Sequence, residues 1–212
     1  MNLAISQKHE APQRTVAALA IARYTEPGEL VVDLGCGSGR ALVEAIHADR
    51  LAIGIERNSR LAREAREAVV QATVHGGPGF AAVVVGELAD VPQLVGSDSL
   101  HRASLVFVDL SRAGVLGVHG RVEVAGVVQR LSDALGAARQ LVREGGHVVV
   151  RAEIRQPFCR DLAELLSEVG ARSEFEVVVV PVPDRGQCQM RCRLTRNEEI
   201  VVLRAVSPTN DA

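Results

Sequence analysis

The sequence of 212 residues contains few aromatic side chains, no tryptophan and no long hydrophobic run. With one tyrosine and four phenylalanines, it lacks the material for an aromatic platform on which single-stranded nucleic acid stacks. No segment reaches the roughly 18 apolar residues of a membrane-spanning helix. Residues 1–10 lack the apolar core of a signal peptide. These absences predict a soluble, cytoplasmic protein.

An excess of either charge is also missing, and cysteine is scarce. The 24 basic and 26 acidic residues give a net charge of −2, which argues against a protein that coats a phosphate backbone. Five arginines form a basic cluster near the end of the chain: Arg185, Arg191, Arg193, Arg196 and Arg204. We expect them to lie on a solvated face, and contact with a nucleic acid is the alternative. Four cysteines suit a reducing compartment. Because Cys188 and Cys192 have no second closely spaced pair, we expect no metal.

The length and the alternation of apolar runs predict one α/β domain over residues 1–212. Continuous β-branched runs are typical of parallel strands covered on both faces. The predicted strands are 30–34, 51–55, 81–85, 105–110, 147–151, 175–182 and 200–204. The predicted helices are 12–24, within an N-terminal segment 1–28, and 40–48, 58–74, 124–142 and 157–169. The glycine-bearing segment 111–123 is predicted to be an active-site loop.

The strongest motif is a glycine-rich turn between a strand and a helix. The segment 31–39 reads VVDLGCGSG, so that Asp33 ends an apolar run before Gly35, Gly37 and Gly39. Alternate glycines permit a tight turn and let a ligand lie against bare backbone. The dinucleotide-binding fingerprint requires a later third glycine, where this chain has Arg40, and no phosphate-binding P-loop motif is present.

This spacing resembles motif I of class I S-adenosylmethionine (SAM)-dependent methyltransferases. The resemblance implies that SAM is the cofactor, and that Asp33, Gly35, Gly37 and Gly39 lie around it. It also implies a Rossmann-like class I methyltransferase fold, an α/β sheet of seven mostly parallel strands flanked by helices. The implied strand order is 3-2-1-4-5-7-6, with the last strand antiparallel.

Acidic residues stand at the ends of three further predicted strands. Glu56 follows the second strand, where its two carboxylate oxygens can accept both ribose hydroxyls. Glu87 takes the position at which the family commonly contacts adenine, with Asp90 as a substitute. Asp109 ends the fourth strand, where the ligand crevice of an open α/β sheet lies. A solvated strand end or a turn cap is the alternative role for each.

A narrower resemblance extends over most of the chain. The N-terminal EAP at 10–12, the run YTEPGELVVD at 24–33, AIGIE at 52–56, GGHVVV at 145–150 and NEEIVVLR at 197–204 carry it. They resemble bacterial DNA amino-methylases and related tRNA guanine-N2 methyltransferases. The resemblance implies methyl transfer to a base amino group of DNA or RNA.

The chain departs from that family in the segment after the fourth predicted strand, where the family's motif holds the target base. Such enzymes carry [DNS]-P-P-[YFW] after the fourth strand, whereas this chain has Asp109-Leu110-Ser111-Arg112. Asp109 retains the hydrogen-bond acceptor with which the motif begins. The Arg112 guanidinium is a candidate for stacking on a base in place of the aromatic ring. His119, in the loop 111–123, is a candidate general base or a loop residue without a role. The predicted catalytic residues are therefore Asp109, Arg112 and His119.

The sequence predicts a SAM-dependent methyltransferase acting on a nucleic-acid base amino group. Two alternatives stay open, a small-molecule methyltransferase and a non-catalytic SAM-binding homologue. The altered motif favours both alternatives. Retention of the glycine turn and Glu56 favours cofactor binding in all three cases.

Overall fold

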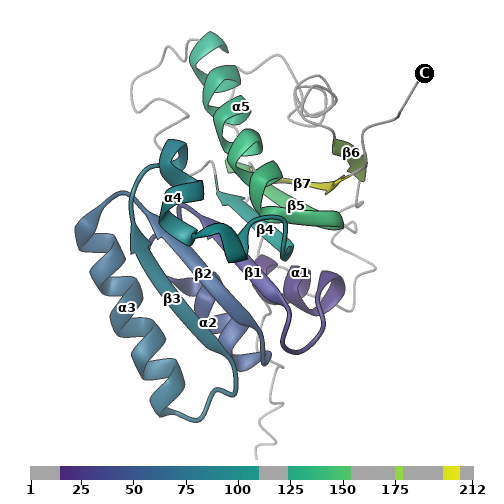
Figure 1. Ribbon diagram of the computed structural model, residues 1–212. Coiled ribbons are helices and arrows are strands. Elements are labelled where there is room, and N and C mark those ends of the chain that lie inside the picture. The colour runs from purple at the N-terminus through teal and green to yellow at the C-terminus, as the bar shows by residue number, and fades with distance from the viewer. Residues whose placement is uncertain (1–14, 110–123, 154–174, 179–197, 206–212) are drawn as a thin grey trace, which may run out of the picture.

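The computed structural model describes residues 15–109, 124–153, 175–178 and 198–205. Helices and strands alternate along most of this length (Figure 1). The helices are α1 (Val16–Tyr24), α2 (Arg40–His47), α3 (Ser59–Val74), α4 (Val91–Val95) and α5 (Val124–Leu141), with short 3-10 turns η1 (Leu88–Asp90) and η2 (Ser97–Ser99). The strands are β1 (Leu30–Leu34), β2 (Leu51–Glu56), β3 (Phe80–Val85), β4 (Ala103–Asp109), β5 (Val142–Glu153), β6 (Phe175–Val178) and β7 (Glu198–Ala205).

One sheet contains the seven described strands in the order β3-β2-β1-β4-β5-β7-β6. The five strands from β3 to β5 are parallel, and β7 runs antiparallel to both β5 and β6. This is the order that the family resemblance implies. The prediction of a Rossmann-like methyltransferase fold is therefore confirmed.

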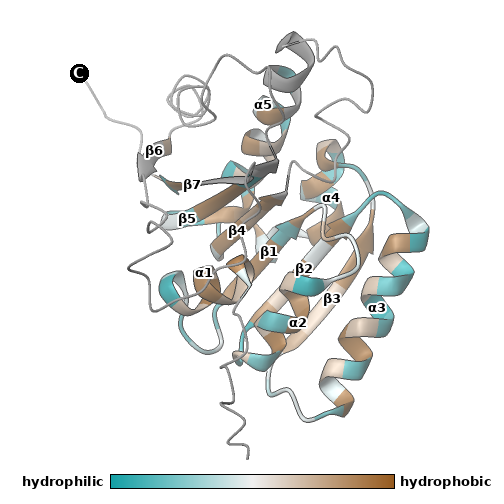
Figure 2. Cartoon of the chain, turned by 180° about the vertical axis from the view of Figure 1, so that it is seen from behind, coloured by the Kyte–Doolittle hydropathy of each residue, from teal (hydrophilic) through white to brown (hydrophobic). Residues whose placement is uncertain are grey.

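Helices cover both faces of the sheet because its central strands are apolar on both sides. On one face, Val31, Leu105 and Val149 pack against side chains of α1, α2 and α3. On the other face, Val32 and Val106 pack against α4 and α5. Figure 2 shows the hydrophobic strands in the middle and the polar side of α3 facing outward. Buried β-branched runs such as Val148–Val150 thus form two-sided strands, as expected for a parallel sheet.

The start of β5 differs from the prediction. The sequence predicted a helix to residue 142 and a strand from 147, whereas α5 ends at Leu141 and β5 begins at Val142. The register with β4 shifts between Ala103 and Leu105. Gly146 permits this irregular pairing, since a Cβ there would lie 3.0 Å from the Ala103 carbonyl oxygen. The short elements η1, α4 and η2 were not predicted, and the predicted helix 157–169 lies outside the described residues.

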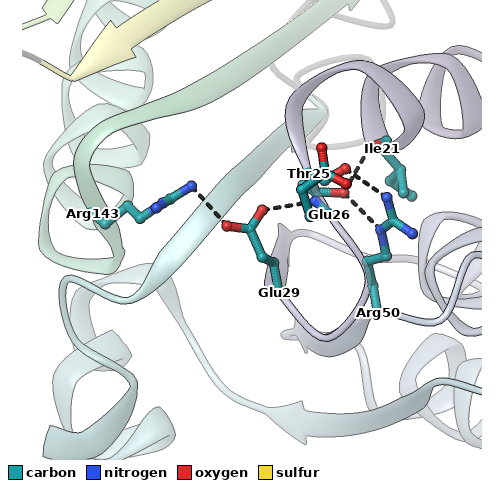
Figure 3. A network of polar contacts seen from close by, with 6 residues as sticks. All are labelled: Ile21, Thr25, Glu26, Glu29, Arg50 and Arg143. Carbon is teal, nitrogen blue, oxygen red and sulfur yellow. Dashed lines mark hydrogen bonds and ion pairs between the residues drawn. The ribbon is translucent and has the colours of Figure 1, made fainter.

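A buried arginine ties α1 to the turn before β2 (Figure 3). Arg50 Nε donates to Thr25 Oγ1 at 2.9 Å, and Nη2 donates to the Thr25 carbonyl at 2.6 Å. Arg50 Nη1 donates to the Ala48 carbonyl. These bonds give hydrogen-bond acceptors to the donors of an arginine that is only 8% exposed. The described helices include none with the length and apolar character needed to cross a membrane.

Candidate functional site

The parallel topology brings the predicted site residues to one edge of the sheet. The carboxyl ends of β1, β2, β3 and β4 lie side by side, because these strands are neighbours and run in the same direction. The chain crosses from β1 outward to β2 and β3, then returns to the other side of β1 with β4. Such a reversal of strand order is where open α/β sheets bind ligands.

The glycine-rich turn leaves β1 and leads into α2. Gly35, Gly37 and Gly39 all have positive φ angles, of 86°, 56° and 81°. The amides of Gly35 and Cys36 both donate to the Ile55 carbonyl, at 2.8 and 3.1 Å, so the turn is anchored to β2. Gly39 also lies against α3, since a Cβ there would stand 3.1 Å from Ala65 Cα. Glycine is therefore required by backbone conformation and by helix packing.

Glu56 joins the end of β2 to the same turn. Its Oε2 accepts a hydrogen bond from the Gly37 amide at 2.9 Å, and its Oε1 accepts one from the Asn58 amide at 2.8 Å. Asn58 in turn caps α3, with its side-chain oxygen accepting from Arg60 and Leu61 amides. Glu56 is 7% exposed, and its carboxylate lies near the N-terminus of α3, where the helix dipole favours negative charge. Two backbone donors thus fix its orientation.

Gly54 is a site-supporting residue that the sequence analysis did not single out. It lies in β2 beneath the glycine-rich turn, in register with the buried Asp33 of β1. A Cβ at Gly54 would come within 2.6 Å of Leu42 Cδ1 and 2.8 Å of Cys36 Sγ. A glycine between two isoleucines in the interior of a strand is the signal that points to this close approach.

The third strand end carries the predicted adenine-binding residues. Gly86 follows β3, and its amide donates to the Glu56 carbonyl at 3.2 Å, which holds the β3 end beside the β2 end. Glu87 precedes η1, and both Glu87 and Asp90 are exposed. Neither carboxylate caps the short helix that follows it. Their positions are compatible with an adenine contact, which stays a prediction.

The predicted catalytic residues fall at the limit of the described chain. Asp109 is the last residue of β4, in register with Arg151 of β5. Arg112, His119 and the rest of the loop 111–123 lie outside the described residues, as do Cys188 and Cys192. In the ranges that the structure describes, no group of three His, Cys, Asp or Glu residues is placed to hold a metal ion.

The described residues fit the ribose end of SAM. Each Glu56 oxygen accepts one backbone N–H, and a carboxylate oxygen has two lone pairs, so each retains acceptor capacity for a hydroxyl group. A Cβ at Gly35 would meet no atom within 4 Å, which shows open space against the turn backbone. A ligand can therefore approach the turn backbone at Gly35.

Solved structures share this fold at low sequence identity. A TehB-like SAM-dependent methyltransferase from Corynebacterium glutamicum matches with a TM-score of 0.58 and 18% identity, over 90% of this chain and 87% of its own. A SAM-dependent methyltransferase from Methanosarcina mazei matches with a TM-score of 0.60 and 15% identity, over 88% and 96% of the two chains.

A third match is magnesium protoporphyrin IX methyltransferase from Synechocystis, solved with bound SAM. Its TM-score is 0.59 at 16% identity, over 90% of this chain and 76% of that one. No family model and no curated protein matches the sequence. The comparisons show that the chain has the Rossmann-like fold of class I SAM-dependent methyltransferases.

Proposed function

We propose that this protein binds SAM at the carboxyl edge of the sheet and transfers its methyl group to an acceptor. The observation that carries the proposal is the Glu56 carboxylate, which two backbone amides hold against the glycine-rich turn. A carboxylate so fixed offers two oriented acceptors at a distance suited to neighbouring hydroxyls of a ribose. The fold shared with SAM-dependent methyltransferases supports the same assignment.

The residues divide the work of binding. Gly35 and Gly37, with positive φ angles and no side chains, form a turn against which the ligand lies. Glu56 accepts hydrogen bonds from the ribose hydroxyls. Exposed Glu87 is placed after β3 to accept from an adenine amino group. SAM supplies a methyl group on a sulfonium, which is already a good leaving group. The protein then contributes mainly by orienting the acceptor for in-line attack.

Calorimetry with SAM and S-adenosylhomocysteine tests the cofactor assignment. Wild-type protein is expected to bind both, and Glu56→Ala is expected to weaken binding by about 1.5–3 kcal/mol, since it removes a charged acceptor. Glu64→Ala, on the exposed side of α3, is the matched control and should leave affinity unchanged. Binding of NAD with no binding of SAM would contradict the proposal.

For the acceptor, we propose a base amino group of DNA or RNA. The support is the resemblance of the sequence to amino-methylases, together with Asp109 at the carboxyl end of β4. The shared fold does not favour one acceptor class, because one neighbour methylates a porphyrin. A metabolite acceptor is the second candidate, and Leu110-Ser111-Arg112 in place of the family motif favours it.

A panel of variants separates the acceptor classes. Asp109→Ala is expected to lower turnover far more than SAM affinity, because Asp109 is proposed to orient the nucleophile. If Arg112 stacks on a base, Arg112→Tyr should keep activity on nucleic acid and Arg112→Ala should lose it. If Arg112 pairs with an anionic metabolite, both changes should be equally damaging. SAM binding without methyl transfer to DNA, tRNA or metabolite pools would overturn the enzymatic role and leave a SAM-binding protein.

A further inference from the structure

A cluster of basic and aromatic side chains lies at the amino end of the sheet, on the edge opposite the glycine-rich turn. Tyr24, at the end of α1, stacks on His147 of β5, with ring centroids 4.3 Å apart and 28° between the planes. The Arg23 guanidinium lies 5.7 Å from the centroid of the Tyr24 ring. His147 is in register with Leu105 near the start of β4, which places the pair at the amino edge.

Three arginines from separate parts of the chain converge on this pair. Arg23 comes from α1, Arg143 from the first residues of β5, and Arg204 from β7, where it lies directly across from His147. All three are exposed. Since the whole chain carries a net charge of −2, this gathering of positive charge is a local feature.

The ion pairs of the cluster leave part of this charge uncompensated. Arg143 Nη2 lies 2.8 Å from Glu29 Oε1, and the other oxygen of Glu29 accepts from the Glu26 amide (Figure 3). Among the side chains that the structure describes, no ion pair involves Arg23 or Arg204. Glu176 of β6 lies across from Arg204 in the sheet register. Arg23 is thus the guanidinium of the cluster most available to an anion from solvent, whereas Arg204 has Glu176 as its neighbour across the sheet.

The positive potential of the cluster acts on the imidazole of His147. Burial lowers the pKa of His147 below its ordinary value, and Arg204, Arg143 and Arg23 lower it further. The other titratable groups on the elements around it are the Tyr24 phenol of α1, Glu29, which pairs with Arg143, and Glu176, across from Arg204 on β6. An anion bound among the arginines offsets their charge and makes protonation of His147 easier.

We propose that Arg23, Arg143, Arg204 and His147 form a binding site for a phosphate group. Guanidinium forks match phosphate oxygens in pairs, and a phosphate group has more acceptor oxygens than a carboxylate for the donors of several arginines. His147 adds a further donor once it is protonated. Phosphate binding and protonation of His147 therefore strengthen each other, as linkage requires.

This site is independent of methyl transfer. It lies at the amino edge of the sheet, whereas the glycine-rich turn and Glu56 lie at the carboxyl edge. The phosphate group bound here therefore lies away from the chemical group that receives the methyl. Two sources share this chemistry, a small phosphorylated molecule and the backbone of a nucleic acid.

Nuclear magnetic resonance of histidine side chains in the full chain tests the site. Inorganic phosphate is titrated against chloride at constant ionic strength, and the pKa of His147 is measured at each step. The pKa is expected to rise with phosphate, and phosphate affinity is expected to increase as the pH falls. Arg23→Gln combined with Arg204→Gln should weaken phosphate binding by about tenfold or more.

Arg60→Gln is the matched control, because Arg60 is an exposed arginine on α3 away from the cluster. It should change neither the pKa of His147 nor phosphate affinity. A His147 pKa that phosphate does not move, or full affinity in the double variant, would overturn the proposal. Ribose 5-phosphate and a short single-stranded RNA then distinguish the sources. RNA binding that is tighter, salt-dependent and lost in the double variant assigns a nucleic acid, and binding of ribose 5-phosphate alone assigns a small ligand.

Discussion

At the scale of single residues, Glu56 has a structural role that is separable from ligand binding. Its two oxygens satisfy the amides of Gly37 and Asn58, which come from different loops. A glutamine has only one acceptor oxygen, so Glu56→Gln leaves one buried amide facing an NH₂ group. We expect a loss of about 1–3 kcal/mol in the free energy of unfolding, measured by denaturant titration without ligand.

Glu64→Gln is the control for that substitution. Glu64 lies on the exposed side of α3 and pairs with Arg60 across one helical turn at 3.1 Å. Such surface pairs contribute at most about 1 kcal/mol. Equal losses in the two variants would show that the Glu56 carboxylate does not hold the turn.

His147 links stability to pH at the same scale. Its pKa in the folded protein lies below 6.5, the ordinary value that applies to the unfolded chain. As the pH falls through 6.5, the unfolded chain therefore takes up a proton that the folded protein does not, and the folded state loses relative stability. His147→Phe keeps a ring against Tyr24 and removes the titration. The stability of wild type relative to this variant should fall between about pH 7.5 and 5, and a constant difference would contradict the shift.

At the scale of secondary structure elements, β2 and α2 pack through Gly54. A Cβ at this position would approach Leu42 Cδ1 and Cys36 Sγ to 2.6 and 2.8 Å, and all three residues are buried. Gly54→Ala is therefore expected to destabilise the protein by about 1–3 kcal/mol through overpacking. Gly136→Ala is the matched control, since a Cβ there meets nothing within 4 Å in α5. The control should gain about 0.5–1 kcal/mol from helix propensity.

The elements show which features a sequence can predict. Apolar runs and strong caps gave β1, β2, α2 and α3 within one residue at either end, because local signals and burial agree there. The β5 start was wrong, because Val142 suits both a helix end and a strand, and only pairing with Ala103 decides between them. The 3-10 turns between residues 88 and 99 carry no periodic pattern. Long-range packing fixes such segments.

In the candidate site, too, some features follow from local sequence and others only from long-range packing. The sequence predicts that Asp33, Gly35, Gly37, Gly39 and Glu56 lie at strand ends, and the parallel pairing of β1 and β2 brings these two strand ends together. Gly54 and the cluster around His147 could not be predicted, because Tyr24, His147 and Arg204 come together only through the strand order. The sequence predicted Arg204 to lie on a solvated face with the other late arginines. Its position next to His147 follows only from the pairing of β5 with β7.

At the scale of the whole molecule, a ligand that binds only the folded state stabilises all cooperative elements together. SAM at a concentration of 100 times its dissociation constant adds about 2.7 kcal/mol to the free energy of unfolding. For a chain of this length, that corresponds to a rise of about 5–10 °C in melting temperature. We expect this shift with SAM and with S-adenosylhomocysteine, and none with NAD, in a thermal unfolding assay.

Gly37→Val connects this global response to the turn. Gly37 has a φ of 56°, and its amide donates to Glu56, so a β-branched side chain there strains the backbone where the ligand is proposed to lie. The strained turn should abolish the SAM-dependent shift while the unliganded variant still unfolds cooperatively, because the apolar cores on both faces of the sheet do not include Gly37. A variant that melts at a lower temperature but keeps the full SAM shift would separate the turn from the cofactor. Such a result would move the proposed binding site away from the carboxyl edge of β1.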